Sequence, residues 1–279
     1  MAESERLAPG LHIVATPIGN LGDLSPRAAD ILCRADRILV EDSRVTAKLL
    51  AHVGAKGPMQ RYDEHSSDSA RKSIVARLGD EAVALVSDAG TPLISDPGYK
   101  LVRAARAAGH AIHTIPGPSA AIAALTLAGL PTDRFLFLGF LPAKAKARGD
   151  AIAEIATVRA TLLLYESGPR LGACLATLAQ SLGPRDAAVV REITKLHEEC
   201  VTGTLAELAE RYADIAPRGE IVIVVGPPRD AEEASDEAID AALDAALART
   251  SVSRAAAEVA GELGVARKRV YARALERGR

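Results

Sequence analysis

The chain has 279 residues, 48% of them hydrophobic and 25% charged, an ordinary composition for a globular protein and a length sufficient for two domains. Its formal net charge of −2 excludes a globally basic chain, so nucleic-acid binding would require a local patch. The polar segment Met1–Pro9 does not resemble a signal peptide, and no apolar run approaches the roughly 20 residues of a membrane span.

The first 115 residues alternate between short apolar strands and helices. Strands are predicted at residues 11–16, 37–40, 82–86 and 111–115, and helices at 27–34, 45–52, 69–78 and 97–106. Ser25 and Pro26 suit the start of the first helix, and Asp96 as cap with Pro97 suits the start of the last. This alternation predicts a doubly wound parallel sheet.

A second α/β unit is expected after the break at Pro116–Ser119. An Ala-rich helix reaches residue 128, strands are predicted at 135–140, 161–165, 187–193 and 221–225, and helices at 150–158 and 205–212. Residues 142–149 are predicted to form a basic loop carrying Lys144, Lys146 and Arg148. We therefore expect α/β domains at 10–117 and 118–227, with a ligand crevice between them.

The C-terminal residues predict a small helical module after a linker at 226–236. Its helices are expected at 236–249, at 254–262 between Ser253 as cap and Gly264 as stop, and at 266–277. The third is basic, with Val270 and Leu275 expected to face the other two. Two helices joined by a tight turn predict a helix-turn-helix-like module over 236–279.

Three cysteines, Cys33, Cys174 and Cys200, lie far apart, without metal-ligand spacing. This indicates a reducing, cytoplasmic environment. Cys33 and Cys174 fall in apolar helical patterns and are expected in the core. The histidines show no metal-ligand spacing either, and we interpret His12, in a strand, as structural. No metal site is predicted.

The segment Ser87–Gly98 is the strongest candidate for a ligand site. It follows a buried strand and contains two carboxylates, two glycines and three hydroxyls. It is longer than the roughly 2–6 residues that usually connect a strand to a helix. Loops at the carboxyl ends of strands line the ligand crevice of open α/β sheets, so we favour a site for a small polar ligand over a plain connection.

The common nucleotide and hydrolase motifs are missing. Residues Thr16–Asp23 offer two glycines but no Gly-x-Gly-x-x-Gly, and no P-loop is present. Ser167-Gly168 lacks the Gly-x-Ser-x-Gly frame. This argues against a Rossmann dehydrogenase, an NTPase, the common Rossmann methyltransferase and a serine hydrolase.

Six motifs in register resemble those of the bacterial 16S ribosomal RNA (cytidine-2′-O)-methyltransferases, in the tetrapyrrole (corrin/porphyrin) methylase superfamily. They are Thr16–Asp23, Glu41–Arg44, Ser87–Gly98, Pro116–Ser119, Gly139–Pro142 and Tyr165–Ser167. The resemblance spans roughly residues 10–226, and the C-terminal module is similar to an extension that some of these enzymes carry. It implies two α/β domains with S-adenosylmethionine between them, a homodimer, and a decoding-centre cytidine of 16S rRNA in the 30S subunit as substrate.

The resemblance also implies roles for individual residues. Cofactor contacts are expected from Asp88, Gly90, Thr91, Ser95, Asp96, Ser119, Ala120 and Tyr165. Backbone amides near Gly90 and at the helix beginning by Ser119 would suit the methionyl carboxylate. Tyr165 would pack on the adenosine, although a buried strand-end tyrosine explains it equally well.

Catalytic roles are expected among Asp23, Asp42, Arg44 and Glu166, with Asp88 a further candidate proton acceptor. Each carboxylate has the alternative of a helix cap or ion pair, with Arg44 the obvious partner of Glu41 or Asp42. RNA contacts are expected from Lys144, Lys146, Arg148, Arg267, Lys268, Arg269 and Arg273. Two alternatives stay open: a porphyrinoid C-methyltransferase, and a DNA-binding regulator that senses a metabolite.

Overall fold

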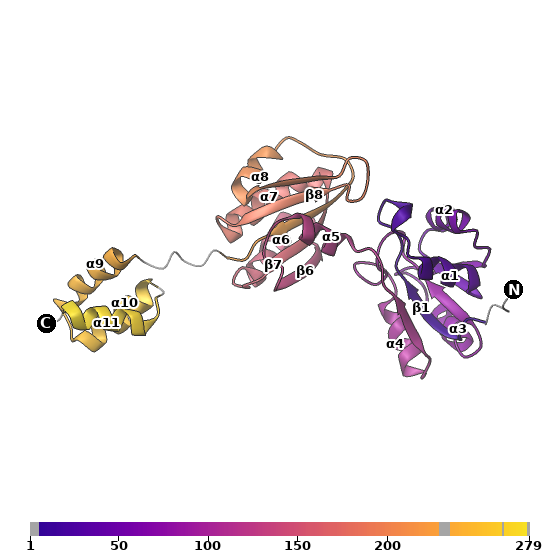
Figure 1. The fold of residues 1–279 in the computed structure, drawn as a ribbon, viewed down its shortest axis with the longest axis horizontal. Coiled ribbons are helices and arrows are strands. Elements are labelled where there is room, and N and C mark those ends of the chain that lie inside the picture. The colour runs from indigo at the N-terminus through magenta and orange to yellow at the C-terminus, as the bar shows by residue number, and fades with distance from the viewer. Residues whose placement is uncertain (1–5, 229–234, 264, 278–279) are drawn as a thin grey trace. The chain divides into compact units, whose positions relative to one another are not determined.

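The computed structural model describes residues 6–228, 235–263 and 265–277. It divides into two compact units, residues 1–227 and residues 228–279 (Figure 1). None of the helices in the described residues is long and apolar enough to cross a membrane.

The first sheet of the larger unit is parallel throughout. Its strands β1 (Gly10–Val14), β2 (Arg37–Val40), β3 (Met59–Arg61), β4 (Ala82–Leu85) and β5 (Ile112–Ile115) lie in the order β3-β2-β4-β1-β5. Helices α1 (Pro26–Arg34) and α2 (Ser43–Val53) pack in one hydrophobic cluster, and α3 (Asp68–Arg77) and α4 (Tyr99–Ala107) in another. Helices on both faces of a parallel sheet confirm the doubly wound prediction.

One helix start in this half differs from the prediction. Ser25 caps α1 as expected, its hydroxyl accepting from the Ala28 amide at 3.1 Å. Helix α4 begins instead at Tyr99, with Gly98 as cap at φ +134°. A Cβ on Gly98 would lie 2.9 Å from Leu85 Cδ2, so only glycine fits between loop and strand. The predicted cap Asp96 therefore stays in the loop.

The second sheet is mixed. Its strands β6 (Phe135–Phe140), β7 (Thr161–Ser167), β8 (Asp186–Arg191), β9 (Glu199–Thr204) and β10 (Glu220–Val225) lie in the order β6-β7-β10-β8-β9. Only β6 and β7 run parallel. Helices α6 (Ala145–Ile155), α7 (Gly168–Leu182) and α8 (Leu205–Arg211) share one core cluster, and α5 (Ala120–Leu127) belongs to the other. Strand β9 was not predicted, and α7 was expected only as an apolar helical pattern around Cys174, without bounds.

The predicted basic loop at 142–149 is wrong in its second half. Helix α6 begins at Ala145 and includes Arg148, which is buried. The Arg148 guanidinium donates to Thr177 Oγ1 at 3.0 Å and to the Ala143 carbonyl at 3.3 Å. Arg148 therefore holds α6 to α7 and is not available to a phosphate.

The smaller unit contains α9 (Asp236–Leu247), α10 (Val252–Leu263) and α11 (Arg267–Arg277) around one apolar core. Ser253 lies inside α10 rather than capping it, since the first helical bonds end on the Ser251 carbonyl. Gly264, the predicted stop, lies outside the described residues. Val270 is buried as predicted, whereas Leu275 is 48% exposed and Ala274 takes the inward position.

Of the two cysteines expected in the core, one is buried and one is exposed, and His12 is buried. Cys174 is buried in α7, but Cys33 is exposed on α1, its thiol 3.3 Å from the Val53 carbonyl. His12 is buried in β1, with its ring stacked on His113 and a nitrogen 2.9 Å from the Ala8 carbonyl. This packing supports a structural role for His12.

Candidate active site

The larger unit contains a cavity of about 430 Å³ lined by loops that follow strands of the first sheet and by strands of the second sheet. Its lining includes the carboxyl-terminal loop of β4, the start of α5, the end of β7 and the beginning of β10. The eight residues predicted to contact the cofactor all lie in this lining: Asp88, Gly90, Thr91, Ser95, Asp96, Ser119, Ala120 and Tyr165.

Backbone pairing fixes one end of the Ser87–Gly98 loop. Thr16 and Gly90 form an isolated antiparallel bridge, with their amides donating to each other's carbonyls at 2.8 and 3.1 Å. The Thr91 hydroxyl donates to the Pro118 carbonyl at 3.0 Å. The Gly90 amide is thus already engaged, so only other amides near Gly90 are left for the predicted carboxylate contact.

The middle of the loop adopts backbone conformations that non-glycine residues rarely occupy. Leu93 has φ +74° and Ser95 has φ +65°. Such conformations cost about 1–3 kcal/mol each and persist where the surrounding structure enforces them. Ser95 Oγ lies 3.0 Å from the place a Cβ would take on Gly139, so this serine sits against β6. The loop is therefore held in shape before any ligand binds.

The start of α5 is the better site for an anion. Ser119 makes no side-chain capping bond, and the first helical bond runs from the Ala123 amide to the Ser119 carbonyl at 2.9 Å. Amides in the first turn of a helix attract negative charge. The Ala121 amide also contacts the Tyr165 hydroxyl, whose pKa is raised because the side chain is half-buried. The Tyr165 ring meets Phe137 and Phe140 edge-on, with centroids 5.0 and 5.6 Å apart.

Three carboxylates, Asp88, Asp96 and Glu41, give the cavity lining a negative character. Burial raises the pKa of Asp96, and the nearby charge of Asp88 raises it further. The pKa of Glu41 is also raised, first by burial and then by Asp88 and Asp96. Carboxylates crowded together in this way favour a cationic ligand. The cavity thus has an anion-binding helix start and a cation-attracting wall.

The four residues predicted to be catalytic occupy different surroundings. Glu166 lines the cavity, but its carboxylate is buried 3.2 Å from the Arg170 guanidinium. Asp42 caps α2 and pairs with Arg44, which lowers the pKa of Asp42 to about 2. Asp23 belongs to a short 3₁₀ turn, Leu21–Asp23, and does not line this cavity or either of the two that adjoin it. The alternative of cap or ion pair therefore describes Asp42 and Glu166 well.

Two further cavities adjoin the first. One of about 360 Å³ is bounded by the loop after β1 and by α2, and another of about 430 Å³ contains Asp42, Arg44 and Arg61. Asp88 lines all three cavities. One of its oxygens accepts from the Asp42 amide at 3.0 Å, which fixes the carboxylate where the cavities meet.

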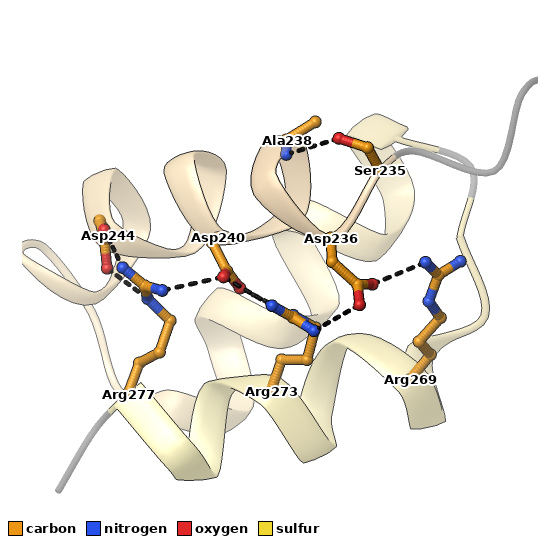
Figure 2. Close-up of polar contacts among 8 residues, drawn as sticks. All are labelled: Ser235, Asp236, Ala238, Asp240, Asp244, Arg269, Arg273 and Arg277. Carbon is orange, nitrogen blue, oxygen red and sulfur yellow. Dashed lines mark hydrogen bonds and ion pairs between the residues drawn. The ribbon is translucent and has the colours of Figure 1, made fainter.

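The predicted RNA-binding residues of α11 divide into two sets. Arg269, Arg273 and Arg277 form a ladder with Asp236, Asp240 and Asp244 of α9, with contacts of 2.5–2.9 Å (Figure 2). Arg267 and Lys268 are exposed, and Arg267 contacts the Ser253 hydroxyl at 3.4 Å rather than an aspartate of α9. In the larger unit, Lys144 and Lys146 are exposed. The ladder is the alternative to RNA contact for Arg269 and Arg273.

Sequence reasoning missed Glu41, Phe140 and Glu220 as lining residues. Glu41 and Phe140 each stand at the carboxyl end of a predicted strand, a signal that was available for both. Glu220 begins β10, which runs antiparallel to β7, so Glu220 pairs beside Ser167. A parallel second sheet would have put Glu220 at the opposite edge.

Comparison with known proteins decides the family. A family model, Tetrapyrrole (Corrin/Porphyrin) Methylases, matches residues 10–209, and one for the RsmI C-terminal HTH domain matches residues 233–278. The chain belongs to the tetrapyrrole methylases. It is therefore a methyltransferase that uses S-adenosylmethionine, and the predicted family, fold and cofactor are confirmed.

Two similar curated proteins share one name, ribosomal RNA small subunit methyltransferase I. It is 54% identical over 273 residues to ribosomal RNA small subunit methyltransferase I of Erythrobacter litoralis, which covers 98% of this chain and 97% of that protein. The enzyme of that name from Mesorhizobium japonicum is 46% identical over 274 residues, covering 97% and 92%. This methylase thus belongs to the ribosomal RNA small subunit methyltransferase I family.

Solved structures share the fold at low identity. Diphthine synthase superimposes with a TM-score of 0.61 at 16% identity, covering 77% of this chain and 89% of that one. Uroporphyrin-III C-methyltransferase of Thermus thermophilus, solved with S-adenosylhomocysteine, gives 0.53 at 22% identity, covering 78% and 97%.

Proposed function

We propose that this methylase binds S-adenosylmethionine in the 430 Å³ cavity and methylates the ribose 2′-hydroxyl of a cytidine in the decoding centre of 16S rRNA, in the 30S subunit. One observation carries the proposal: the eight residues that the family resemblance implied for cofactor contact converge on one cavity. The names of the relatives supply the ribosomal RNA small subunit as substrate. The enzyme would act in the cytoplasm.

The residues present suit the cofactor. Its carboxylate would meet the uncapped first turn of α5, and its two positive charges would face Asp88, Asp96 and Glu41. Tyr165 and Phe140 offer ring surface for the adenine. The Glu166 carboxylate accepts from the Ser167 amide at 2.9 Å, pairs with Arg170 at 3.2 Å and contacts the Cys174 thiol of α7, so its partners lie within the chain.

The chemistry requires one proton acceptor. The bound cofactor supplies a methyl group on a positively charged sulfur, which is an activated electrophile. The chain must orient the ribose hydroxyl and remove its proton. We assign this role to Asp88, since it lies where the cavities meet and is held by the Asp42 amide. Asp42 is a poor base, because the hydrogen bond from Arg44 lowers its pKa to about 2.

RNA contact outside the cavities is assigned to exposed basic side chains. Lys144, Lys146, Arg267 and Lys268 are exposed, and contacts from them would fix the position of the RNA through its phosphates. Arg148, being buried, is not among them.

A homodimer is part of the proposal. Helix α5 is apolar except for Thr126, and its Ile122 and Leu127 are exposed, at 46% and 40%. Apolar side chains exposed on such a helix suit contact with a second copy. Sedimentation at micromolar concentration should give twice the chain mass of 29.1 kDa. A clean monomer would contradict this part.

The decisive experiment incubates the protein with methyl-labelled S-adenosylmethionine and unmodified 30S subunits, then maps the label by nuclease digestion. Label in a ribose of one decoding-centre cytidine supports the proposal. Label in a base, or elsewhere in the RNA, would overturn the ribose assignment. Transfer to a porphyrinoid instead of RNA would make the enzyme a C-methyltransferase. Binding of duplex DNA in preference to 30S subunits would favour the regulator.

A further inference from the structure

The 360 Å³ cavity next to the proposed cofactor site has no role in the function described so far. It shares four lining residues with that site: Ile18, Asp88, Ala89 and Glu220. A group bound in one cavity therefore meets a group bound in the other at this common wall. Of the two shared carboxylates, Glu220 is paired with Lys195 at 3.2 Å, which leaves Asp88 for a ligand.

One wall of this second cavity is apolar and open. Pro17 and Leu21 come from the loop after β1, and Val45 comes from α2. Leu21 is 45% exposed and Val45 is 42% exposed, although both are large apolar residues. Exposed apolar side chains on a cavity wall suit the face of a flat ring.

Polar groups surround the rest of this cavity. Thr46 is buried, with only 2% of the residue exposed. Its hydroxyl has no hydrogen-bond partner in the part of the chain that the structure describes. Buried hydroxyls without a partner are uncommon, and at a cavity wall they point to a missing ligand.

Two lysines supply positive charge to this cavity, and within the described part of the chain one of them is held in ion pairs and the other is not. Lys195 is held by Glu192 and Glu220 at 3.0 and 3.2 Å, and its stem packs on Gly19, where a Cβ would lie 2.6 Å from Lys195 Cγ. Lys48 on α2 is exposed, and no carboxylate of the described residues contacts it. Lys48 is therefore free to bind an external anion.

We propose that this second cavity is the acceptor subsite, which receives one RNA nucleotide that has left its base stack. The ribose lies at the wall shared with the first cavity, the base lies against Leu21 and Val45, and a phosphate binds Lys48. A ribose inside a cavity requires its nucleotide to leave the helical stack, as enzymes that modify a single nucleotide commonly demand. This inference rests on the proposed function.

The test uses full-length protein, labelled S-adenosylmethionine and 30S subunits. Lys48→Ala should raise the KM for 30S about tenfold and reduce its salt dependence by roughly 0.7–0.9 of a unit of slope, since one phosphate contact is lost. Val45→Glu should raise KM by at least about tenfold, because its carboxylate would repel the RNA. Lys48→Arg should restore KM, and Lys72→Ala, an exposed lysine on α3, is the matched control.

Cofactor affinity, measured by calorimetry without RNA, should be the same in all variants. If wild-type protein methylates 30S subunits and both Lys48→Ala and Val45→Glu match Lys72→Ala, the inference is overturned and the proposed function stands. If wild-type protein binds the cofactor but methylates no 30S, the proposed function fails and the subsite with it. A changed sedimentation mass in the variants, with unchanged KM, would make this surface a contact between copies and would also overturn it.

Discussion

Asp88 is the residue on which the proposed chemistry depends most directly, because all three cavities meet there. Asp88→Asn keeps the shape and the acceptor oxygen for the Asp42 amide but removes the base. We expect kcat at saturating 30S to fall about 10²–10⁴-fold, the usual contribution of general base catalysis. Cofactor affinity should fall much less.

Single-turnover methylation and calorimetry measure these two quantities. Asp214→Asn, at an exposed aspartate outside the cavities, is the control. A variant of Asp88 that keeps the wild-type rate would move the proton transfer to another group. Glu41 would be tested next, because it lines the same cavity and its pKa is raised by burial.

Cofactor binding should depend on pH through Asp96 and Glu41. Both pKa values are raised above the ordinary 3.8 and 4.5, mainly by burial, so both groups stay neutral at pH values where exposed carboxyls are charged. As the pH rises through the raised values the groups ionise, and affinity for a cationic ligand should increase. Calorimetry between about pH 4 and 7 should show this rise, and Asp96→Asn should flatten it.

The same shift predicts the sign of the effect on stability. A carboxyl with a raised pKa in the folded state binds protons more tightly there than in the unfolded state, so its ionisation opposes folding. Without cofactor, the unfolding midpoint should therefore fall as the pH rises through the raised pKa of Asp96. Asp96→Asn should remove part of that fall, and an unchanged pH profile would contradict the assignment.

At the scale of elements, the ladder between α9 and α11 determines which arginines are available to RNA. Its members recur every four residues on both helices, so the rows face each other along one line (Figure 2). Arg273 contacts both Asp236 and Asp240. Arg273→Gln should accelerate amide hydrogen exchange in α9 and α11 at low salt, because two ion pairs are lost.

This effect should largely disappear near 1 M salt, where the screening length is only about 3 Å. Lys268→Gln, outside the ladder on the same helix, should leave hydrogen exchange unchanged but weaken 30S binding. Equal effects of the two variants on exchange would show that the ladder does not stabilise the unit.

The pKa values of Asp240 and Asp244 are lowered by their arginines. The contribution of the ladder to the stability of the helical unit is therefore present above pH 3.8 and is lost as the pH falls below it.

Elements with strong apolar periodicity were predictable, and those without it were not. The bounds of β2 and β6 match the prediction because β2 lies between the acidic residues Asp36 and Glu41, and β6 is an apolar run between Arg134 and the break at Leu141-Pro142. Strand β3, Met59–Arg61, is a short edge with no apolar pattern. Helix α7 follows β7 without an intervening loop, so its opening Gly168-Pro169 has the sequence signature of a turn.

The candidate site was predictable where it depends on the carboxyl ends of strands. That rule found the loop after β4 and the end of β7. The same rule could not identify which basic side chains are available to RNA. The burial of Arg148 and the pairing of Arg273 depend on partners about 30 residues distant in the chain. Tertiary pairing of charges leaves no periodic signal in the sequence.

At the scale of the whole molecule, the two compact units predict separable roles. The larger unit has its own hydrophobic cores and contains every residue of the proposed cofactor site. A chain ending at Pro227 should therefore stay folded and keep its affinity for S-adenosylmethionine. Its 30S binding should weaken, and the salt slope should drop by about 1–2 units, since Arg267 and Lys268 are the exposed α11 cations outside the ladder.

Filter binding across a salt series measures the slope, and single-turnover methylation at saturating 30S measures the chemistry. An unchanged slope with a lower melting temperature would mean that the basic residues only stabilise the protein. A fall of orders of magnitude in the single-turnover rate would mean that the helical unit positions the reacting ribose.

The place of β10 in the second sheet affects the order in which the enzyme assembles. This strand is the last of the larger unit along the chain, yet it lies in the middle of its sheet, between β7 and β8. Until it is inserted, β7 and β8 have no common neighbour and the wall formed by Gly219–Val222 is missing. Pairing between strands so far apart in sequence is slow. A nascent chain still in the exit tunnel at residue 220 is therefore catalytically incompetent, and activity begins only once the whole larger unit has left the ribosome.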